Sequence, residues 1–329
     1  MILGDLKNYL NRKSEWPMKS DQTLKKILWA IDPQPKFLKY NKRLLKSLSL
    51  FFAERGVIVQ PVFVMSPDIF QIEQTFSVAF SQKLELAVLE ESRNLLKKFE
   101  QGGVRPLKIL RSTKPGQDQA ALLLSRFARS QRAQCIVTLK TSPDYEGRGA
   151  GSFTQSLLFK SKTPLLVVPS DRLDLSALKT IVFATDFSTS SRKAFAHVLR
   201  YAKHFSAKVI VYHKIVSNMS ALIQSGVYII GGGWITSTPM STAERKNAQK
   251  NGADFLNLAR QSKVPAKLTL KGSDVSLIDE LTSLSKKKGV MVALGSESGK
   301  FESRLIGSVA LSLLETSNGI LWIDRSQAK

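Results

Sequence analysis

Short runs of apolar and β-branched residues alternate along the chain with longer segments in which apolar residues recur every three or four positions. The runs are typical of strands buried on both faces of a sheet, and the longer spacing is typical of amphipathic helices. In the first half, this pattern predicts strands at 26–31, 57–65, 106–111, 135–140 and 164–168, with helices at about 41–55, 77–101, 117–130 and 152–162. In the second half, it predicts strands at 180–185, 208–216, 266–271, 290–295 and 319–323, with helices at about 190–206, 242–262, 275–287 and 304–317. Strands that alternate with helices form a parallel sheet with helices on both faces, so we expect an α/β fold.

The two halves repeat one unit. The segments "LKKILWAID" and "LKTIVFATD" are both apolar strands that end in an aspartate, Asp32 in the first and Asp186 in the second. Near the ends of the two halves, "GSFTQSLLFKSKTPLLVVP" and "GSVALSLLETSNGILWI" align without a gap. We therefore expect an N-terminal extension at 1–21, one domain at 22–172 and a second domain at 173–329. Each last strand is apolar and would leave an open sheet edge, so we expect the two to pair.

Asp186 is the first candidate for function. It follows the strand predicted at 180–185, and ligands of parallel sheets bind at the carboxyl ends of strands, where the strand order reverses. Two interpretations remain open. The carboxylate faces a ligand, or it accepts hydrogen bonds from loop amides while Ser188 or Thr189 caps the next helix.

A glycine-containing loop is the second candidate. The strand predicted at 290–295 ends at Gly295, and Gly307 and Ser308 lie in the opening turns of the next helix. Loop amides and a helix N-terminus together attract anions, and glycine lets a phosphate approach the backbone. The sequence therefore predicts an anion site after this strand.

The segment "TIVFATDFSTSSRKAFAHVLRYAKHFSAKVIVYH", with the glycine loop and the repeat, resembles the universal stress protein family in its tandem two-domain form. The resemblance covers roughly residues 22–329. It implies two Rossmann-like units, each a five-stranded parallel sheet in the order 3-2-1-4-5, which associate through their fifth strands. Many members bind ATP through an aspartate after strand one and a G-x2-G-x9-G-(S/T) loop after strand four.

Carried over by position, the resemblance implies that Asp186 contacts the adenosine end of a nucleotide. Gly295 would match the first loop glycine, and Gly307 and Ser308 the last glycine and its hydroxyl residue. The loop is one residue shorter than the family pattern, and Glu297 places negative charge beside the expected phosphates. We therefore expect weak binding of ATP, ADP or AMP, with fewer phosphates fitting better.

The first copy departs further from the family pattern. Prolines follow Asp32, and Thr138 and Thr141 stand where the two early glycines are expected, although Gly151 is kept. Proline removes amide donors, and β-branched side chains crowd the space that a phosphate needs. We expect that this copy has lost phosphate binding.

Composition adds a strong positive charge. The chain carries 49 Lys and Arg residues against 26 Asp and Glu, a formal net charge of +23 that is shared by both halves. Such a field attracts nucleic acid, anionic lipid or anionic metabolites. The single cysteine, Cys135, excludes an internal disulfide framework and is expected to be a buried thiol. Three histidines and one cysteine form no zinc pattern, and no continuous apolar stretch is long enough to span a membrane, so we expect a cytoplasmic protein.

Three functions follow. The first is a stress-response protein that binds an adenine nucleotide in its second domain and acts through protein partners or self-association. The sequence identifies no catalytic base and no complete metal site, so slow ATP hydrolysis is the most that we expect. The second is a ligand-free interaction module, and the third is a basic protein that binds nucleic acid without sequence preference. The uncharged segment 215–243 is either a contact surface for a partner or an insertion packed over its own domain.

Overall fold

The computed structural model describes residues 23–33, 35–66, 103–140, 152–215, 242–272, 275–295 and 308–324, with scattered positions between 83 and 97. The proposed extension 1–21, Gly307, Thr141, Gly151 and nearly all of the uncharged segment lie outside these residues. Most of the helix expected at 77–101 also lies outside the described residues.

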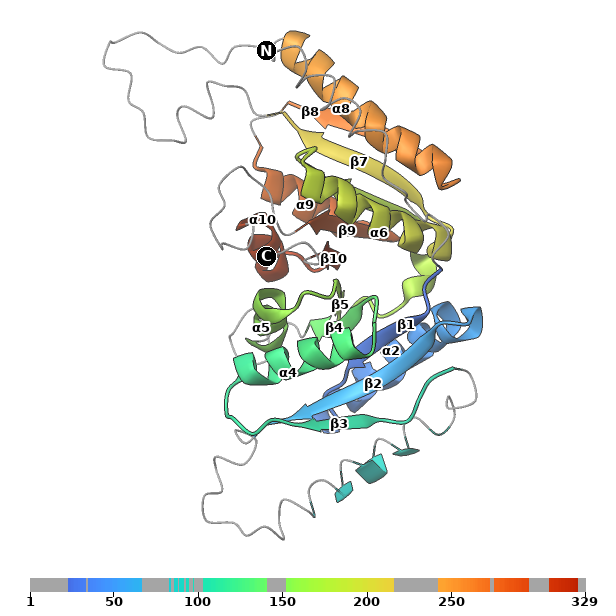
Figure 1. The fold of residues 1–329 in the computed structure, drawn as a ribbon, viewed down its shortest axis with the longest axis vertical. Helices are drawn as coiled ribbons and strands as arrows, with labels where there is room; N and C mark the ends of the chain where they lie inside the picture. The colour runs from blue at the N-terminus through green and yellow to red at the C-terminus, as the bar shows by residue number, and fades with distance from the viewer. Residues whose placement is uncertain are drawn as a thin grey trace, which may run out of the picture.

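Ten strands form one continuous sheet in the order β3-β2-β1-β4-β5-β10-β9-β6-β7-β8 (Figure 1). The first five are β1 (Lys26–Ala30), β2 (Ile58–Met65), β3 (Lys108–Arg111), β4 (Ile136–Lys140) and β5 (Leu165–Pro169). The second five are β6 (Thr180–Ala184), β7 (Lys208–Lys214), β8 (Ala266–Lys271), β9 (Val290–Gly295) and β10 (Ile320–Asp324). Each half has the order 3-2-1-4-5 with parallel neighbours, as expected.

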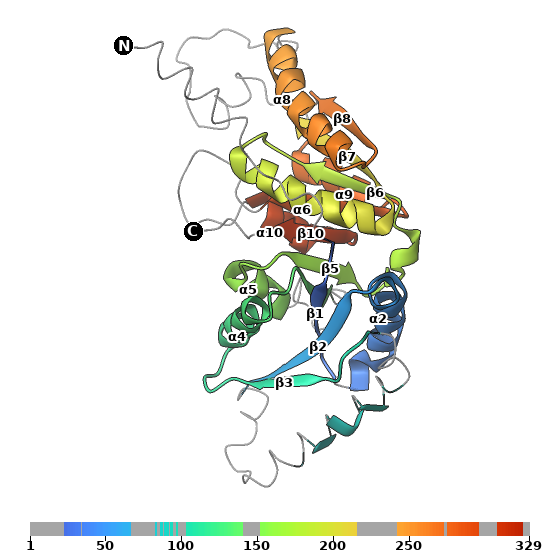
Figure 2. The ribbon, with the colours of Figure 1, turned by 45° about the vertical axis from the view of Figure 1, so that its right-hand side comes forward.

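Helices cover both faces of this sheet (Figure 2). One face packs against α2 (Leu38–Phe51), α6 (Thr189–Phe205) and α8 (Thr242–Gln261). The other packs against α4 (Gln117–Ser130), α5 (Ser152–Lys160), α9 (Leu277–Ser285) and α10 (Ser308–Thr316). Apolar residues of both halves contribute to the core on each face, so the sheet buries a continuous core across its middle.

One predicted helix was misplaced. Periodicity predicted a helix at about 41–55, but α2 begins earlier, after a 3-10 turn at Pro35–Phe37, and ends at Phe51. A second 3-10 turn, Ala53–Arg55, follows, and Gly56 closes it with a φ of 79°. The left-handed conformation at this glycine ends the segment, and the periodic pattern does not reveal that change.

The two halves join through their fifth strands, which confirms the expected pairing. Strands β5 and β10 are antiparallel, with Trp322 opposite Leu166 and Ile323 opposite Leu165. All four of these side chains are fully buried. The junction therefore removes two open strand edges and buries apolar surface at the same time.

Cations of the first half also cap helix ends of the second half. The buried Lys140 side chain, at the end of β4, donates to the carbonyl oxygens of Ser317 at 2.7 Å and Glu315 at 3.2 Å. Arg172, which follows β5, donates to the carbonyl oxygen of Ser285 at 3.0 Å. The last carbonyls of a helix have no partner within it, so these cations satisfy them and favourably oppose the helix dipole.

On the opposite face, helix α6 contacts the end of α2. The Nε2 atom of His204 lies against the carbonyl oxygen of Phe51, and Arg55 donates to the carbonyl oxygen of His204. The His204 ring also stacks on Phe52 with centroids 5.1 Å apart. Burial lowers the pKa of His204, so the neutral ring donates its Nε2 hydrogen to Phe51.

This histidine predicts how stability depends on pH. Its pKa in the folded protein lies below the unfolded value of about 6.5, so the unfolded chain takes up a proton first as the pH falls. Stability should be unaffected above about pH 6.5 and be lost below it, by about 1.4 kcal/mol for each unit by which the pKa is lowered. His204→Gln keeps a hydrogen-bond donor but cannot titrate. Urea unfolding from about pH 7.5 to 5.5 should therefore show the wild type losing stability relative to this variant, and parallel pH profiles would contradict the prediction.

Candidate functional site

Two of the predicted site residues meet at the carboxyl edge of the second half. Strands β6 and β9 are parallel neighbours with Ala184 paired to Leu294, so both strands end at the same edge of the sheet. Asp186 lies two positions beyond Ala184, and Gly295 is the last residue of β9. The strand order reverses here, because β9 and β7 flank β6 on opposite sides. The structure therefore places both residues where parallel sheets bind ligands.

The Asp186 carboxylate stabilises its own turn. Its Oδ1 atom accepts hydrogen bonds from the Ser188 amide at 3.0 Å and from the Ser191 hydroxyl at 2.6 Å. Ser188 in turn caps α6, since its hydroxyl oxygen accepts from the Ser191 amide at 3.1 Å. The turn interpretation is thus observed. Asp186 is nevertheless exposed, and its Oδ2 atom has no hydrogen bond to the residues that the structure describes.

An aromatic pair lies beside this turn. Phe187 adopts a φ of 62°, a left-handed conformation that is unusual for a bulky residue. Its amide donates to the Thr185 hydroxyl at 2.9 Å, and its ring packs 4.3 Å from that of His213 and 5.5 Å from that of Phe255, measured between centroids. Packing of its partly buried ring against the core therefore offsets strain at Phe187. Sequence analysis did not select Phe187 or His213, because neither the apolar period nor a motif marks them.

The glycine loop is only partly described. Gly295 has no positive φ, and a Cβ atom there would lie 3.5 Å from the Ala194 Cβ, an ordinary contact. Neither packing nor backbone conformation within the described residues therefore requires glycine at 295. Ser308 is the first residue of α10 and is exposed. Gly307 and the rest of 296–307 lie outside the described residues.

The equivalent edge of the first half contains two adjoining cavities of about 210 and 220 Å³. Both are lined by Asp32, Gln117 and Phe153. The buried Thr138 hydroxyl lies 3.1 Å from that of Thr154, in the first turn of α5. No lysine or arginine is among the described residues that line either cavity. Loss of phosphate binding in this copy stays a prediction.

The described residues also settle where the cysteine lies. Cys135 is fully buried, and burial raises the pKa of its thiol to about 12, so the thiol stays neutral. Within the described ranges, His, Cys, Asp and Glu form no group of three that would hold a metal ion. Where the structure describes the chain, none of its helices has both the length and the apolar character needed to cross a membrane.

Sequence and fold comparisons agree with this geometry. The model of the Universal stress protein family matches residues 177–323, while none of the curated proteins matches the sequence significantly. The fold is similar to that of a universal stress protein from Archaeoglobus fulgidus DSM 4304, with a TM-score of 0.60, 12% identity, and coverage of 92% of this chain and 98% of the other. It is also similar to a functionally unknown protein from Pseudomonas aeruginosa PAO1, with a TM-score of 0.50, 14% identity and coverage of 91% and 92%.

These matches define the class of protein. The fold is a tandem Rossmann-like α/β fold in which two five-stranded units share one sheet. The model of the universal stress protein family matches the second half of the chain, and the first half repeats the same fold.

Proposed function

We propose that this protein is a cytoplasmic stress-response protein that binds an adenine nucleotide weakly in its second domain and acts through protein partners. The observation that supports this proposal is the meeting of Asp186 and Gly295 at one edge, where β6 and β9 end. Ser308 begins the helix that follows β9, so its amide is one of the unpaired donors at a helix N-terminus. The proposed domain boundaries remain 22–172 and 173–329.

Asymmetry between the two copies is part of the proposal. In the first copy, the described residues that line the cavities include Asp32 but no lysine or arginine, and the Thr138 hydroxyl is engaged by Thr154. The second copy keeps the aspartate, the two outer glycines and the serine of the family pattern. The acidic residues in its shortened loop weaken phosphate binding, so we expect a dissociation constant of about 10 μM or higher, equivalent to about −7 kcal/mol or less favourable.

Calorimetric titration of AMP, ADP and ATP tests this proposal. Asp186→Ala removes the carboxylate and the turn, whereas Asp186→Asn keeps an oxygen for the Ser188 and Ser191 donors and removes only the charge. Loss of one charge-assisted hydrogen bond should weaken binding at least about tenfold in Asp186→Asn. Gly307→Val should abolish binding, and Asp32→Ala should bind like the wild type.

Other outcomes of the titrations would favour a different site or a different function. Equal loss in Asp32→Ala would move the site to the first copy. If no nucleotide binds the wild type, the ligand-free interaction module becomes the better explanation. The net charge of +23 favours nucleic-acid binding as a further candidate, and such binding should weaken with salt at a slope of about −0.9 for each phosphate neutralised.

A further inference from the structure

A recess of about 330 Å³ lies between the two halves, next to the β5–β10 junction. Helix α6 of the second half contributes His197, Arg200 and Tyr201 to its lining. The first half contributes the end of α4 and the segments that lead into β1, β4 and β5 (Leu24, Arg129, Arg132, Ala133, Gln134, Lys162, Thr163 and Pro164). Because α6 rises about 1.5 Å per residue, Arg200 lies roughly 18 Å along the helix from its cap at Ser188. Arg200 is therefore well separated along α6 from the turn that holds Asp186, although Asp324, the partner of His197, pairs with Gly295 at the end of β9.

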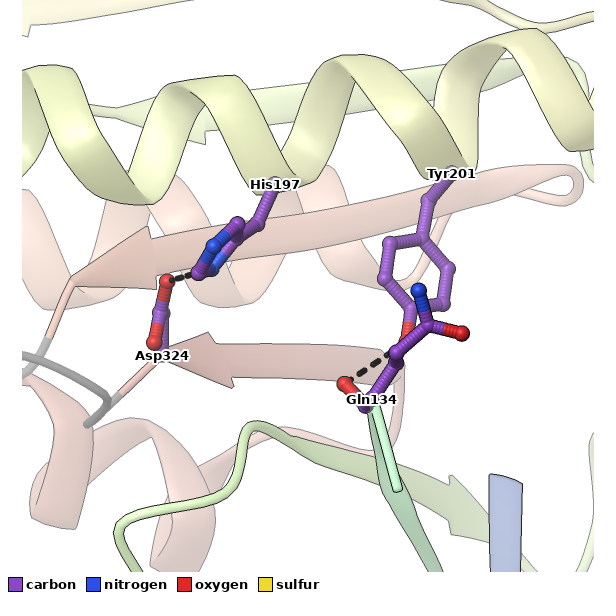
Figure 3. A network of polar contacts seen from close by, with 4 residues as sticks. All are labelled: Gln134, His197, Tyr201 and Asp324. Carbon is purple, nitrogen blue, oxygen red and sulfur yellow. Dashed lines mark hydrogen bonds and ion pairs between the residues drawn. The ribbon is translucent and has the colours of Figure 1, made fainter. Parts of the chain in front are cut away.

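Two contacts give the recess a defined wall (Figure 3). His197 Nδ1 lies 2.7 Å from the Oδ2 atom of Asp324, whose side chain is only 1% exposed. The Tyr201 hydroxyl donates to the carbonyl oxygen of Gln134 across the junction at 3.3 Å. Both contacts join segments far apart in the chain, and they hold this stretch of α6 at the recess.

The lining is strongly cationic. Arg129, Arg132, Lys162 and Arg200 all contribute to it, and no aspartate or glutamate is among the described residues that line it. None of these four side chains forms a hydrogen bond or ion pair with the part of the chain that the structure describes, although Arg200 interacts electrostatically with Asp324. Asp324 lies behind His197 and offsets part of this charge. Four cations facing one small space repel each other, and an anion between them would relieve that repulsion.

Favourable placement at helix ends explains only part of this cluster. Arg129 lies in the last turn of α4, where cations favourably oppose the helix dipole. Arg132, however, has a φ of 51° just after the helix, a position at which glycine is preferred. Arg200 lies inside α6 and is half-buried, and this burial lowers its pKa. At position 132 arginine therefore adopts a backbone conformation that glycine adopts without strain, and such outliers cluster at functional sites.

We propose that this recess binds a small soluble anion of the diphosphate class, held by guanidinium groups of both halves at once. Arginine pairs with phosphate oxygens through two parallel hydrogen bonds, and two linked phosphates can engage arginines on both sides of the junction. The volume lies at the lower end of the range for small-molecule pockets. Leu24, Ala133 and Pro164 form an apolar part of the lining.

Titration of inorganic pyrophosphate into the full-length protein tests this proposal. The ionic strength should be about 0.1 M, because charges about 10 Å apart are then screened and the long-range field of the protein contributes little. Arg132→Gly removes a charge and suits the left-handed backbone, so it should fold at least as stably as the wild type. Arg129→Gln removes a charge from α4. Arg126→Gln is the matched control, since Arg126 is an exposed residue on the same helix that does not line the recess.

Pyrophosphate should bind the wild type more tightly than orthophosphate does. Its dissociation constant should rise about tenfold in Arg132→Gly and in Arg129→Gln, and stay within about twofold in Arg126→Gln. An equal rise in Arg126→Gln would show that only the diffuse field of the protein attracts the anion, and would overturn the proposal. So would the absence of pyrophosphate binding, or binding of duplex DNA that Arg132→Gly weakens while pyrophosphate binding stays unchanged.

Discussion

Trp322→Ala is expected to lower the free energy of unfolding by about 3–5 kcal/mol, the usual cost of removing a fully buried tryptophan. Trp322 is fully buried in β10, opposite Leu166 of β5, and its ring lies 5.6 Å from that of Tyr201 between centroids. The cavity would therefore open at the junction of the two halves. Urea unfolding followed by circular dichroism measures the loss.

Trp29→Ala is the matched control. Trp29 is equally buried but lies in β1, within the first half. Both variants should lose similar free energy, because both leave a cavity of similar size. Only Trp322→Ala should also broaden or split the calorimetric transition, since it weakens the surface that makes the halves unfold together. A loss under about 1 kcal/mol, or a single sharp transition in both variants, would contradict this view of the junction.

Gly289→Ala is expected to cost about 3 kcal/mol or more. Gly289 has a φ of 75°, and a Cβ atom added there would lie 2.4 Å from the carbonyl oxygen of Ala177. The Gly289 carbonyl oxygen also accepts from the amides of Lys179 and Thr180, where β6 begins. To relieve the clash, the backbone at the start of β6 would have to shift. Strand β6 also positions Asp186, which follows its carboxyl end.

Gly56→Ala separates the cost of the left-handed backbone conformation from the cost of the clash. Gly56 has a φ of 79°, nearly the same as Gly289, but nothing lies within 4 Å of an added Cβ atom. Its replacement should cost only about 1–2 kcal/mol, from the left-handed conformation. The difference between the two variants measures the clash with the backbone. Equal thermal and urea stabilities of the two variants would refute the role assigned to Ala177.

The candidate edge was predictable because its parts are local. An apolar run followed by Asp186 identifies a strand end, and the run before Gly295 identifies another. Parallel neighbours bring such ends together without any further information. The hydrogen bonds of Asp186 were harder to assign, because a carboxylate at a strand end serves a turn or a ligand equally well. The hydrogen bonds from the Ser188 amide and the Ser191 hydroxyl to Asp186 established the turn role.

By itself, the sequence determined the repeat, nearly all of the strands and helices, and the apolar fifth strands. These features depend on residue spacing within one element or on similarity between two segments, so they can be predicted without knowledge of the tertiary structure. Only the tertiary structure decided which distant groups meet. The contact of His197 with Asp324 and that of Lys140 with Ser317 join residues from different elements. Such contacts depend on how segments pack and in what register, and hydrophobic burial sets both without leaving a local pattern at the residues that meet.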